Sequence, residues 1–374
     1  MILIIIIIAY KLPLFSQHSF CGEFPHHQAT STNPDSIYYD RFGNSYDILS
    51  AQQLPSNPEM ICDAGYFKLT FSGVDPIYKE VVCQVFKDVS TQFPQRTLTG
   101  YCGQTIPNKI VNIKVNYGKD QNNNDLDCNS NILAVGSPLY YNAVGKHGTN
   151  CNILNYSQVY HKVNGGNSDF ITGDDGLLGL NPCQEKFNFN IESVDPTKYD
   201  LYTVVYHEAM HIMGFASQIK IENPYINLNR FYSFYDLLLY KDGQLVQPSE
   251  QCGTNCYSLV PWFIDQNCEI SVGQNGPKVA YHDNKSDLSH LADSNQGCGN
   301  SDFLMNYHLD IGVRKYLQED ELKIMCDIGY SNNGCESDYI IYPQAIPKKK
   351  DIESSFSYKY NSLDCLPMLF YACN

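Results

Sequence analysis

Two histidines and a glutamate form the group of residues in this sequence that is best suited to chemistry. They are His207, Glu208 and His211, within the stretch VVYHEAMHIMGFAS at residues 204–217. Residues four apart lie on one face of a helix, so both imidazoles can reach one zinc ion at about 2.0–2.1 Å. Glu208 points off that axis, where as general base it can take the proton of a water bound to the zinc.

The residues around this group favour a bound metal over a chance match. Val204, Val205, Ile212, Met213 and Phe215 are apolar, so the helix is expected to be buried. Polar side chains are costly to bury without partners, and a bound ion offsets that cost. The alternative is a core helix whose polar side chains are satisfied within the protein. We therefore expect one catalytic Zn²⁺ ion.

The third protein ligand is not adjacent to the motif. A catalytic zinc site has three protein ligands and an open fourth position. Downstream of the motif the histidines are His282, His290 and His308. Glu222, a carboxylate just past the helix, is an alternative. The site must be completed either by that carboxylate or by a segment distant in the chain.

The elements that must position these residues can be predicted from the apolar periodicity. Asp200 can cap a helix over residues 201–213, and Gly214 suits the left-handed end of that helix. Elsewhere the pattern predicts a helix at 74–93, strands at 109–117 and 131–141, a strand or turn at 175–183, and a short helix at 319–328.

Composition and charge narrow the class of protein. The net charge is −15, so phosphate would be repelled and no nucleic-acid partner is expected. The opening run MILIIIIIA is too short to span a bilayer but suits a secretory signal peptide, with a buried strand as the alternative. The 15 mostly scattered cysteines then indicate disulfides, with at least one thiol unpaired in a monomer. We expect a secreted, extracellular or cell-surface protein.

The arrangement resembles the leishmanolysin family of zinc metalloproteases, within the metzincin clan. The resemblance rests on H-E-x-x-H-x-x-G-F, a long insertion, a later histidine and a late Leu-Met turn, and it covers about residues 62–330. Compact metzincins have the third histidine three residues after the helix glycine, where this chain has Ser217. In leishmanolysins an inserted domain lies between them. The 79 residues from His211 to His290 can hold such an insertion.

The resemblance also implies which histidine is the third ligand. In metzincins a methionine turn follows that histidine, and Met305 in SDFLMNYH suits such a turn. The order excludes His308 and favours His290, with His282 as the alternative. The chain departs from the family pattern at Leu291, where leishmanolysins usually have tryptophan, and after Met305, where they usually have Ala-Pro.

Two further roles follow only from the resemblance. Tyr307 lies two residues after Met305, as does a tyrosine of astacin-like and serralysin-like enzymes that can approach the oxyanion; the alternative is a packing role. Secretion as a zymogen would place a cysteine on the zinc, and Cys21 lies in the right region for it.

The expected fold class is α+β, with a metzincin-type catalytic domain built of a twisted mixed sheet and an active-site helix. An inserted domain is expected between the zinc helix and the third zinc histidine, with disulfides stabilising the whole. The expected segments are a signal peptide (1–16), a pro-segment (17–60), an N-terminal catalytic subdomain with the zinc helix (61–216), an inserted or central subdomain with the third histidine and the methionine turn (217–335), and a short C-terminal tail (336–374).

The expected function is zinc-dependent hydrolysis of peptide bonds. His207, His211 and His290 would hold the zinc, and Glu208 would be the general base. The metzincin resemblance further implies that an edge strand, at residues 132–138, would pair with an extended protein or peptide substrate. We expect a monomer with peripheral membrane or cell-surface association. The alternative is a catalytically inactive relative that serves in adhesion or binding.

Overall fold

A computed structural model describes most of the chain between residues 60 and 331. The described residues are 37–39, 45–47, 60–96, 109–119, 124–142, 153–165, 173–222, 225–227, 231–246, 268–280, 288–331 and 335. The expected signal peptide, Cys21, His282 and the expected tail at 336–374 lie outside them. Within the expected pro-segment, β1 (Ile37–Tyr39) pairs with β2 (Ser45–Asp47) as an antiparallel hairpin.

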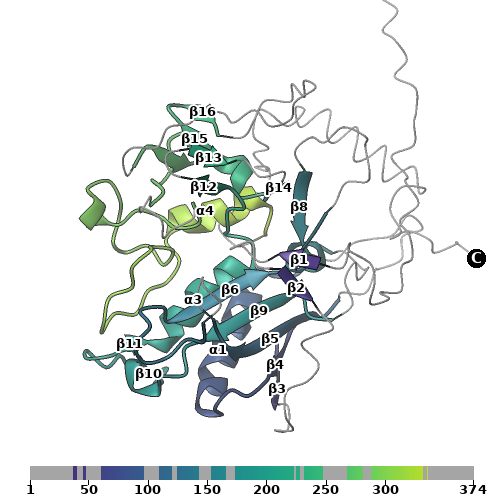
Figure 1. Cartoon of the computed structure of the whole chain (residues 1–374), viewed down its shortest axis with the longest axis vertical. Coiled ribbons are helices and arrows are strands. Elements are labelled where there is room, and N and C mark those ends of the chain that lie inside the picture. Colours follow the sequence, from purple (N-terminus) through teal and green to yellow (C-terminus); the bar gives the residue numbers. More distant parts are fainter. Residues whose placement is uncertain are drawn as a thin grey trace, which may run out of the picture.

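A five-stranded mixed sheet forms the lower part of the molecule in Figure 1. The three central strands are parallel to one another, and each outer strand is antiparallel to its neighbour. In spatial order the strands are β3 (Met60–Ala64), β4 (Phe67–Phe71), β5 (Val111–Tyr117), β9 (Gly176–Leu180) and β6 (Ala134–Pro138).

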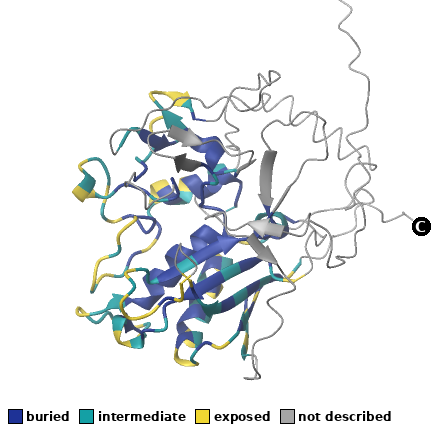
Figure 2. Ribbon diagram, in the orientation of Figure 1, coloured by how far each residue is buried: buried dark blue, intermediate teal, exposed yellow. Residues whose placement is uncertain are grey.

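One face of this sheet is covered by two helices, α1 (Ile77–Gln92) and α3 (Leu201–Ile212). Successive strand residues point to opposite faces, so β4 buries Phe67, Leu69 and Phe71 and leaves the residues between them more exposed. The ring of Phe67 meets Phe86 of α1 edge-on, with 5.0 Å between centroids. The buried residues in Figure 2 gather along this contact between sheet and helices.

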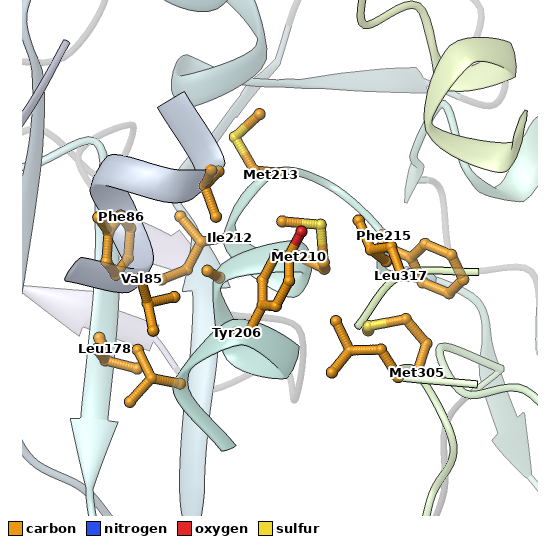
Figure 3. Packing of buried hydrophobic residues seen from close by; sticks show 14 of the residues in the cluster. Val85, Phe86, Leu178, Tyr206, Met210, Ile212, Met213, Phe215, Met305 and Leu317 are labelled. Atoms are coloured by element: carbon orange, nitrogen blue, oxygen red, sulfur yellow. The ribbon is translucent and has the colours of Figure 1, made fainter. Parts of the chain in front are cut away.

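Helix α3 lies in the centre of the core. All twelve of its residues are buried, including its two histidines and its glutamate. Asp200 caps its first turn by accepting a hydrogen bond from Thr203 N, and Gly214 has a φ of +104° just beyond its end. Figure 3 shows Ile212 on the side of Val85 and Leu178, whereas Met210 lies toward Met305.

The remaining elements surround this core. Among them are helix α4 (Glu319–Ile328), three small sheets and one further pair of parallel two-residue strands. The small sheets are β14 (Phe231–Tyr232), β8 (Ile153–Ser157) and β7 (Tyr140–Asn142); β12 (Lys220–Glu222) and β13 (Tyr225–Asn227); and β16 (Gln244–Leu245), β15 (Leu239–Lys241) and β17 (Ile270–Val272). The shorter pieces are α2 (Gln158–Val163), β10 (Phe187–Asn188), β11 (Tyr199–Asp200), η3 (Gln184–Lys186), η4 (Asp236–Leu238) and η5 (Ser294–Gln296).

Four disulfides cross-link the described residues. They join Cys62 to Cys83, Cys128 to Cys183, Cys268 to Cys298 and Cys326 to Cys335. Such bonds form and persist in oxidising compartments, which points to an extracellular location. Among the described residues there is no helix with the length and apolar character that crossing a membrane requires.

The structure confirms the coarse fold class and most of the predicted elements. The fold is α+β with a mixed sheet and disulfides. Helices α1, α3 and α4 and strands β5, β6 and β9 all fall in the predicted ranges. Strands β3 and β4 were not predicted, although the alternation in FKLTF of β4 was a signal for one of them.

Candidate metal centre

Three histidine side chains converge at the C-terminal half of α3. His211 Nε2 lies 3.0 Å from His207 Nε2 and 3.2 Å from His290 Nε2. Ligand nitrogens of a tetrahedral zinc site lie about 3.3 Å apart, as follows from zinc–nitrogen bonds of about 2.0–2.1 Å. The donor atoms therefore have the identity and nearly the spacing that a metal site needs, and the group could hold a metal ion.

Backbone carbonyl groups orient the two helical histidines. His207 Nδ1 lies 2.8 Å from the carbonyl oxygen of Leu304, and His211 Nδ1 lies 2.7 Å from that of Phe215. A carbonyl oxygen can only accept, so each Nδ1 carries the proton and each neutral ring presents the lone pair of Nε2 to the other histidines. Metal-ligating histidines are usually oriented by an outer hydrogen bond of this kind.

His290 lies in an extended segment that is bonded on both sides. Its carbonyl oxygen accepts a hydrogen bond from Ala280 N at 2.8 Å, and Leu291 N donates to the carbonyl oxygen of Met305 at 2.8 Å. The His290 ring stacks on that of His207, with 5.2 Å between centroids and 18° between planes. Met305 is fully buried. The turn that contains Met305 is therefore bonded directly to the segment that carries the third histidine.

Glu208 lies beside the edge strand of the large sheet. Its side chain is buried, and the backbone of β6 passes close to it at Gly136. A Cβ atom at Gly136 would lie 2.3 Å from the carbonyl oxygen of Glu208 and 2.9 Å from its Cβ. Strand β6 can lie this close to the helix because residue 136 has no side chain.

A buried carboxylate of α4 holds the methionine turn. Glu321 accepts hydrogen bonds from Leu304 N at 3.2 Å, Met305 N at 2.7 Å and Gln318 N at 2.8 Å. Burial raises the pKa of Glu321 to about 7, although these donors and Lys315 oppose the rise. The carbonyl group of Leu304 accepts from His207 Nδ1, and the N–H of the same residue donates to Glu321. Leu304 therefore connects Glu321 to His207.

The other candidates from the sequence are placed as follows. The ring of Tyr307 is exposed and meets His290 edge-on, with 5.8 Å between centroids. His308 is at the surface, 3.7 Å from Asp310, and does not belong to the histidine group. Glu222 ends β12, but its side chain is outside the described part, as is His282. Both therefore stay open as alternatives to His290.

Three residues at this site were missed by the sequence reasoning. Glu321 had a local signal, because Gln318 and Glu321 form a capping box at the start of α4. Gly136 lies within the strand predicted at 131–141, but nothing in the sequence indicated its closeness to Glu208. Asp236 had a local signal in the S-x-x-D pattern that it forms with Ser233 before an apolar run, but its bonds to the loop after α3 had none.

Cys128, Cys183 and Glu185 form a second group of potential metal ligands. Its two cysteines are joined in a disulfide, so they do not offer two thiols to a metal.

Comparison with known proteins adds no further assignment: no protein-family model, curated protein or solved structure matches the chain.

Proposed function

We propose that this chain is a zinc-dependent metalloendopeptidase similar to the leishmanolysins. The zinc ligands would be His207, His211 and His290, and Glu208 would be the general base. The proposal rests mainly on one observation: the Nε2 atom of His211 lies 3.0 and 3.2 Å from those of the other two histidines, on a helix that also carries a buried glutamate. These are the donor type and the neighbouring base that metal-assisted hydrolysis requires.

The residues divide the chemistry between them. A zinc ion held there would polarise the scissile carbonyl group and lower the pKa of the attacking water. Glu208 takes the proton of that water and later gives it to the leaving amine. The carbonyl groups of Leu304 and Phe215 keep both helical histidines with Nε2 directed inward. The buried setting strengthens the electrostatic contacts of the site.

The large sheet supports a peptide as the substrate. Strand β6 is its outermost strand on the side of α3, and it pairs only with β9 among the described strands. An extended peptide can add to such an edge by main-chain hydrogen bonds. The edge passes Glu208 at Gly136, so a peptide on it would run close to the proposed base. A mixed sheet with an antiparallel outer strand beside the active-site helix also supports the metzincin-type fold.

Tyr307 is proposed to assist the oxyanion. Its ring is exposed and meets His290 edge-on, with 5.8 Å between centroids, so its hydroxyl group can face a bound substrate. Tyr307→Phe keeps the ring and removes the hydroxyl group. We expect a lower kcat with an unchanged KM, because only the transition state carries the negative charge. Wild-type turnover in this variant would leave Tyr307 with a packing role alone.

The proposed function is tested by casein cleavage and zinc content in Glu208→Gln. We expect zinc retention and a loss of activity of about 10²–10⁴-fold, the usual contribution of a general base. Glu192→Gln is the control, because Glu192 is exposed and does not belong to the histidine group. A wild-type protein that binds zinc without cleaving casein would instead be a binding or adhesion protein. Full activity in Glu208→Gln would refute the role of Glu208.

A further inference from the structure

The third histidine comes from a segment 79 residues beyond His211, so something must fix the two segments relative to each other. Metal ligands have to be held to about 0.5 Å by their surroundings. In a compact site the helix and its following turn can do this. Here the insertion intervenes, and the contacts between its ends decide where His290 lies.

Ser217 makes the first of these contacts. It stands where compact metzincins have the third histidine, and it is buried. Ser217 N donates to Ser289 Oγ at 2.9 Å, across 72 residues of sequence. Ser289 is fully buried and immediately precedes His290. One hydrogen bond thus joins the loop after α3 to the neighbour of the third histidine.

A buried carboxylate anchors the loop side of this bond. Asp236 Oδ1 accepts from Ser217 Oγ at 2.5 Å, and Asp236 Oδ2 accepts from Gln218 N at 2.9 Å. Asp236 Oδ2 also accepts from Ser233 N at 2.7 Å and from Ser233 Oγ at 3.0 Å. Asp236 is fully buried, so solvent does not compete for these bonds. Carboxylate hydrogen bonds of this kind are among the strong ones in proteins.

The same short segment also holds the histidine side. Tyr235 donates its hydroxyl hydrogen to the carbonyl oxygen of Leu288 at 3.0 Å, and the Tyr235 ring packs against Phe215, with 4.8 Å between centroids. Ser233 Oγ is 2.7 Å from the carbonyl oxygen of Ala216. Residues 233–236 therefore bond to the loop that follows α3 and to the segment that precedes His290. We call residues 233–236 the bracket.

We propose that the bracket positions His290 for metal binding, with Asp236 acting through Ser217 and Ser289 as a positioning residue. The inference rests on the proposed zinc site. It gives the inserted segment a defined role, because this segment contains the bracket that places the third ligand against the two histidines of α3. Compact metzincins have their third histidine at the position of Ser217. In this chain the backbone N–H of Ser217 instead donates to Ser289, the residue before His290.

The test compares metal affinity in three variants by chelator competition. Ser289→Ala removes the acceptor for Ser217 N, and Tyr235→Phe removes one hydroxyl group while keeping the packed ring. Ser271→Ala is the matched control, since Ser271 is a buried serine of β17 whose hydroxyl group donates to Gly273 O and to neither of the two segments. We expect zinc affinity to fall by about 10–100-fold in the first two variants and to stay at the wild-type value in the control.

Cobalt substitution separates positioning from general destabilisation. A tetrahedral Co²⁺ site absorbs strongly in the visible range, and absorption weakens when a ligand is lost and water replaces it. We expect a weakened spectrum in saturated Ser289→Ala and Tyr235→Phe, but a wild-type spectrum in Ser271→Ala. Wild-type affinity and spectrum in both Ser289→Ala and Tyr235→Phe would overturn the proposal and leave the zinc site standing. A wild-type protein that binds neither metal would overturn the zinc site itself, and the proposed function with it.

Discussion

At the scale of single residues, the site depends on atoms whose positions are fixed by their neighbours. The Nδ1 atoms of His207 and His211 are 2.8 and 2.7 Å from backbone carbonyl oxygens, which leaves Nε2 for the metal. Glu208 has the backbone of β6 directly beside it. For the two histidines, these contacts explain how polar side chains can be buried on α3, since each Nδ1 has a hydrogen-bond partner.

Gly136 gives a prediction at this scale. In Gly136→Ala the new Cβ would lie 2.3 Å from the carbonyl oxygen of Glu208, so strand and helix must move apart. We expect casein cleavage to fall by at least about 10-fold with zinc still bound, because small misplacements of a base cost activity. Gly118→Ala is the control: its Cβ would meet Leu126 Cδ1 at 2.9 Å and the backbone of Gly179 at 3.1 Å, and neither β6 nor Glu208. Equal loss of activity per folded molecule in both variants would contradict a local effect at Glu208.

At the scale of elements, α3 is fixed at its N-terminal end. Its N-cap residue Asp200 also pairs with Arg314, whose Nη2 lies 2.8 Å from Asp200 Oδ1 and whose Nε lies 3.0 Å from Oδ2. The next residue, Lys315, donates its backbone N–H to Thr203 Oγ1 at 3.0 Å. The segment that follows the turn at Met305 therefore bonds to the first turn of α3 and holds the start of this helix in place.

Loss of this pair should destabilise the fold. Arg314→Met leaves the carboxylate of Asp200 buried without its guanidinium partner, which typically costs about 3–5 kcal/mol. Urea unfolding of the metal-free protein measures the change. Arg96→Met is the comparison, because Arg96 donates from Nε to Ser331 Oγ at 2.7 Å and loses a simpler contact, worth about 1 kcal/mol. Equal losses of unfolding free energy in the two variants would show that the ion pair with Asp200 stabilises the fold no more than the hydrogen bond of Arg96 does.

The helices and strands were predicted better than the contacts between them, because a helix or strand has local signals whereas these contacts join segments distant in the sequence. Helix α4 has the predicted range 319–328, because its amphipathic pattern and its glycine end are local signals. The bounds of α3 could also be predicted from the sequence, because Asp200 caps its start and Gly214 follows its end. The choice of third ligand was not readable from residues alone, since it depends on contacts across 79 residues. Asp236 had a local signal, because Ser233 and Asp236 form an S-x-x-D capping pattern before an apolar run, but its bonds to Ser217 and Gln218 could not be predicted, because those residues lie in another segment.

At the scale of the whole molecule, the site lies between two parts of the chain. The large sheet with α1 and α3 forms the lower part in Figure 1, and α4 with the small sheets forms the upper part. His207 and His211 come from the lower part, and His290 comes from a segment bonded to the methionine turn. The four disulfides suit an extracellular protein. We propose secretion or a cell-surface location on this basis.

A half-buried carboxyl group, that of Asp327, gives the stability of the molecule a predictable pH dependence. Burial raises the pKa of Asp327 from 3.8 to about 6, with Lys323 opposing the rise. The folded state then binds more protons than the unfolded chain between these values, so this contribution to stability is present below about pH 4 and lost as pH rises through about 6. Asp327→Asn should therefore raise Tm at pH 7 and leave it nearly unchanged at pH 4.

Asp195 provides a control for this measurement, because its pKa is shifted in the opposite direction. Hydrogen bonds from Thr197 lower the pKa of the exposed Asp195, so its charged form is favoured in the folded state. Asp195→Asn should lower Tm slightly at pH 7, the opposite sign to Asp327→Asn. If Asp327→Asn shifts Tm by the same amount at both pH values, its effect is one of packing and not of charge.

The central claim is that His207, His211 and His290 together hold one zinc ion, and metal stoichiometry tests it most directly. Zinc content and affinity would be measured for wild type, His290→Ala, His282→Ala and Glu222→Ala. The account predicts one zinc per chain in wild type, in His282→Ala and in Glu222→Ala, with affinity reduced by at least about 10²-fold in His290→Ala. Wild-type affinity in His290→Ala, with zinc lost instead from His282→Ala or Glu222→Ala, would contradict it.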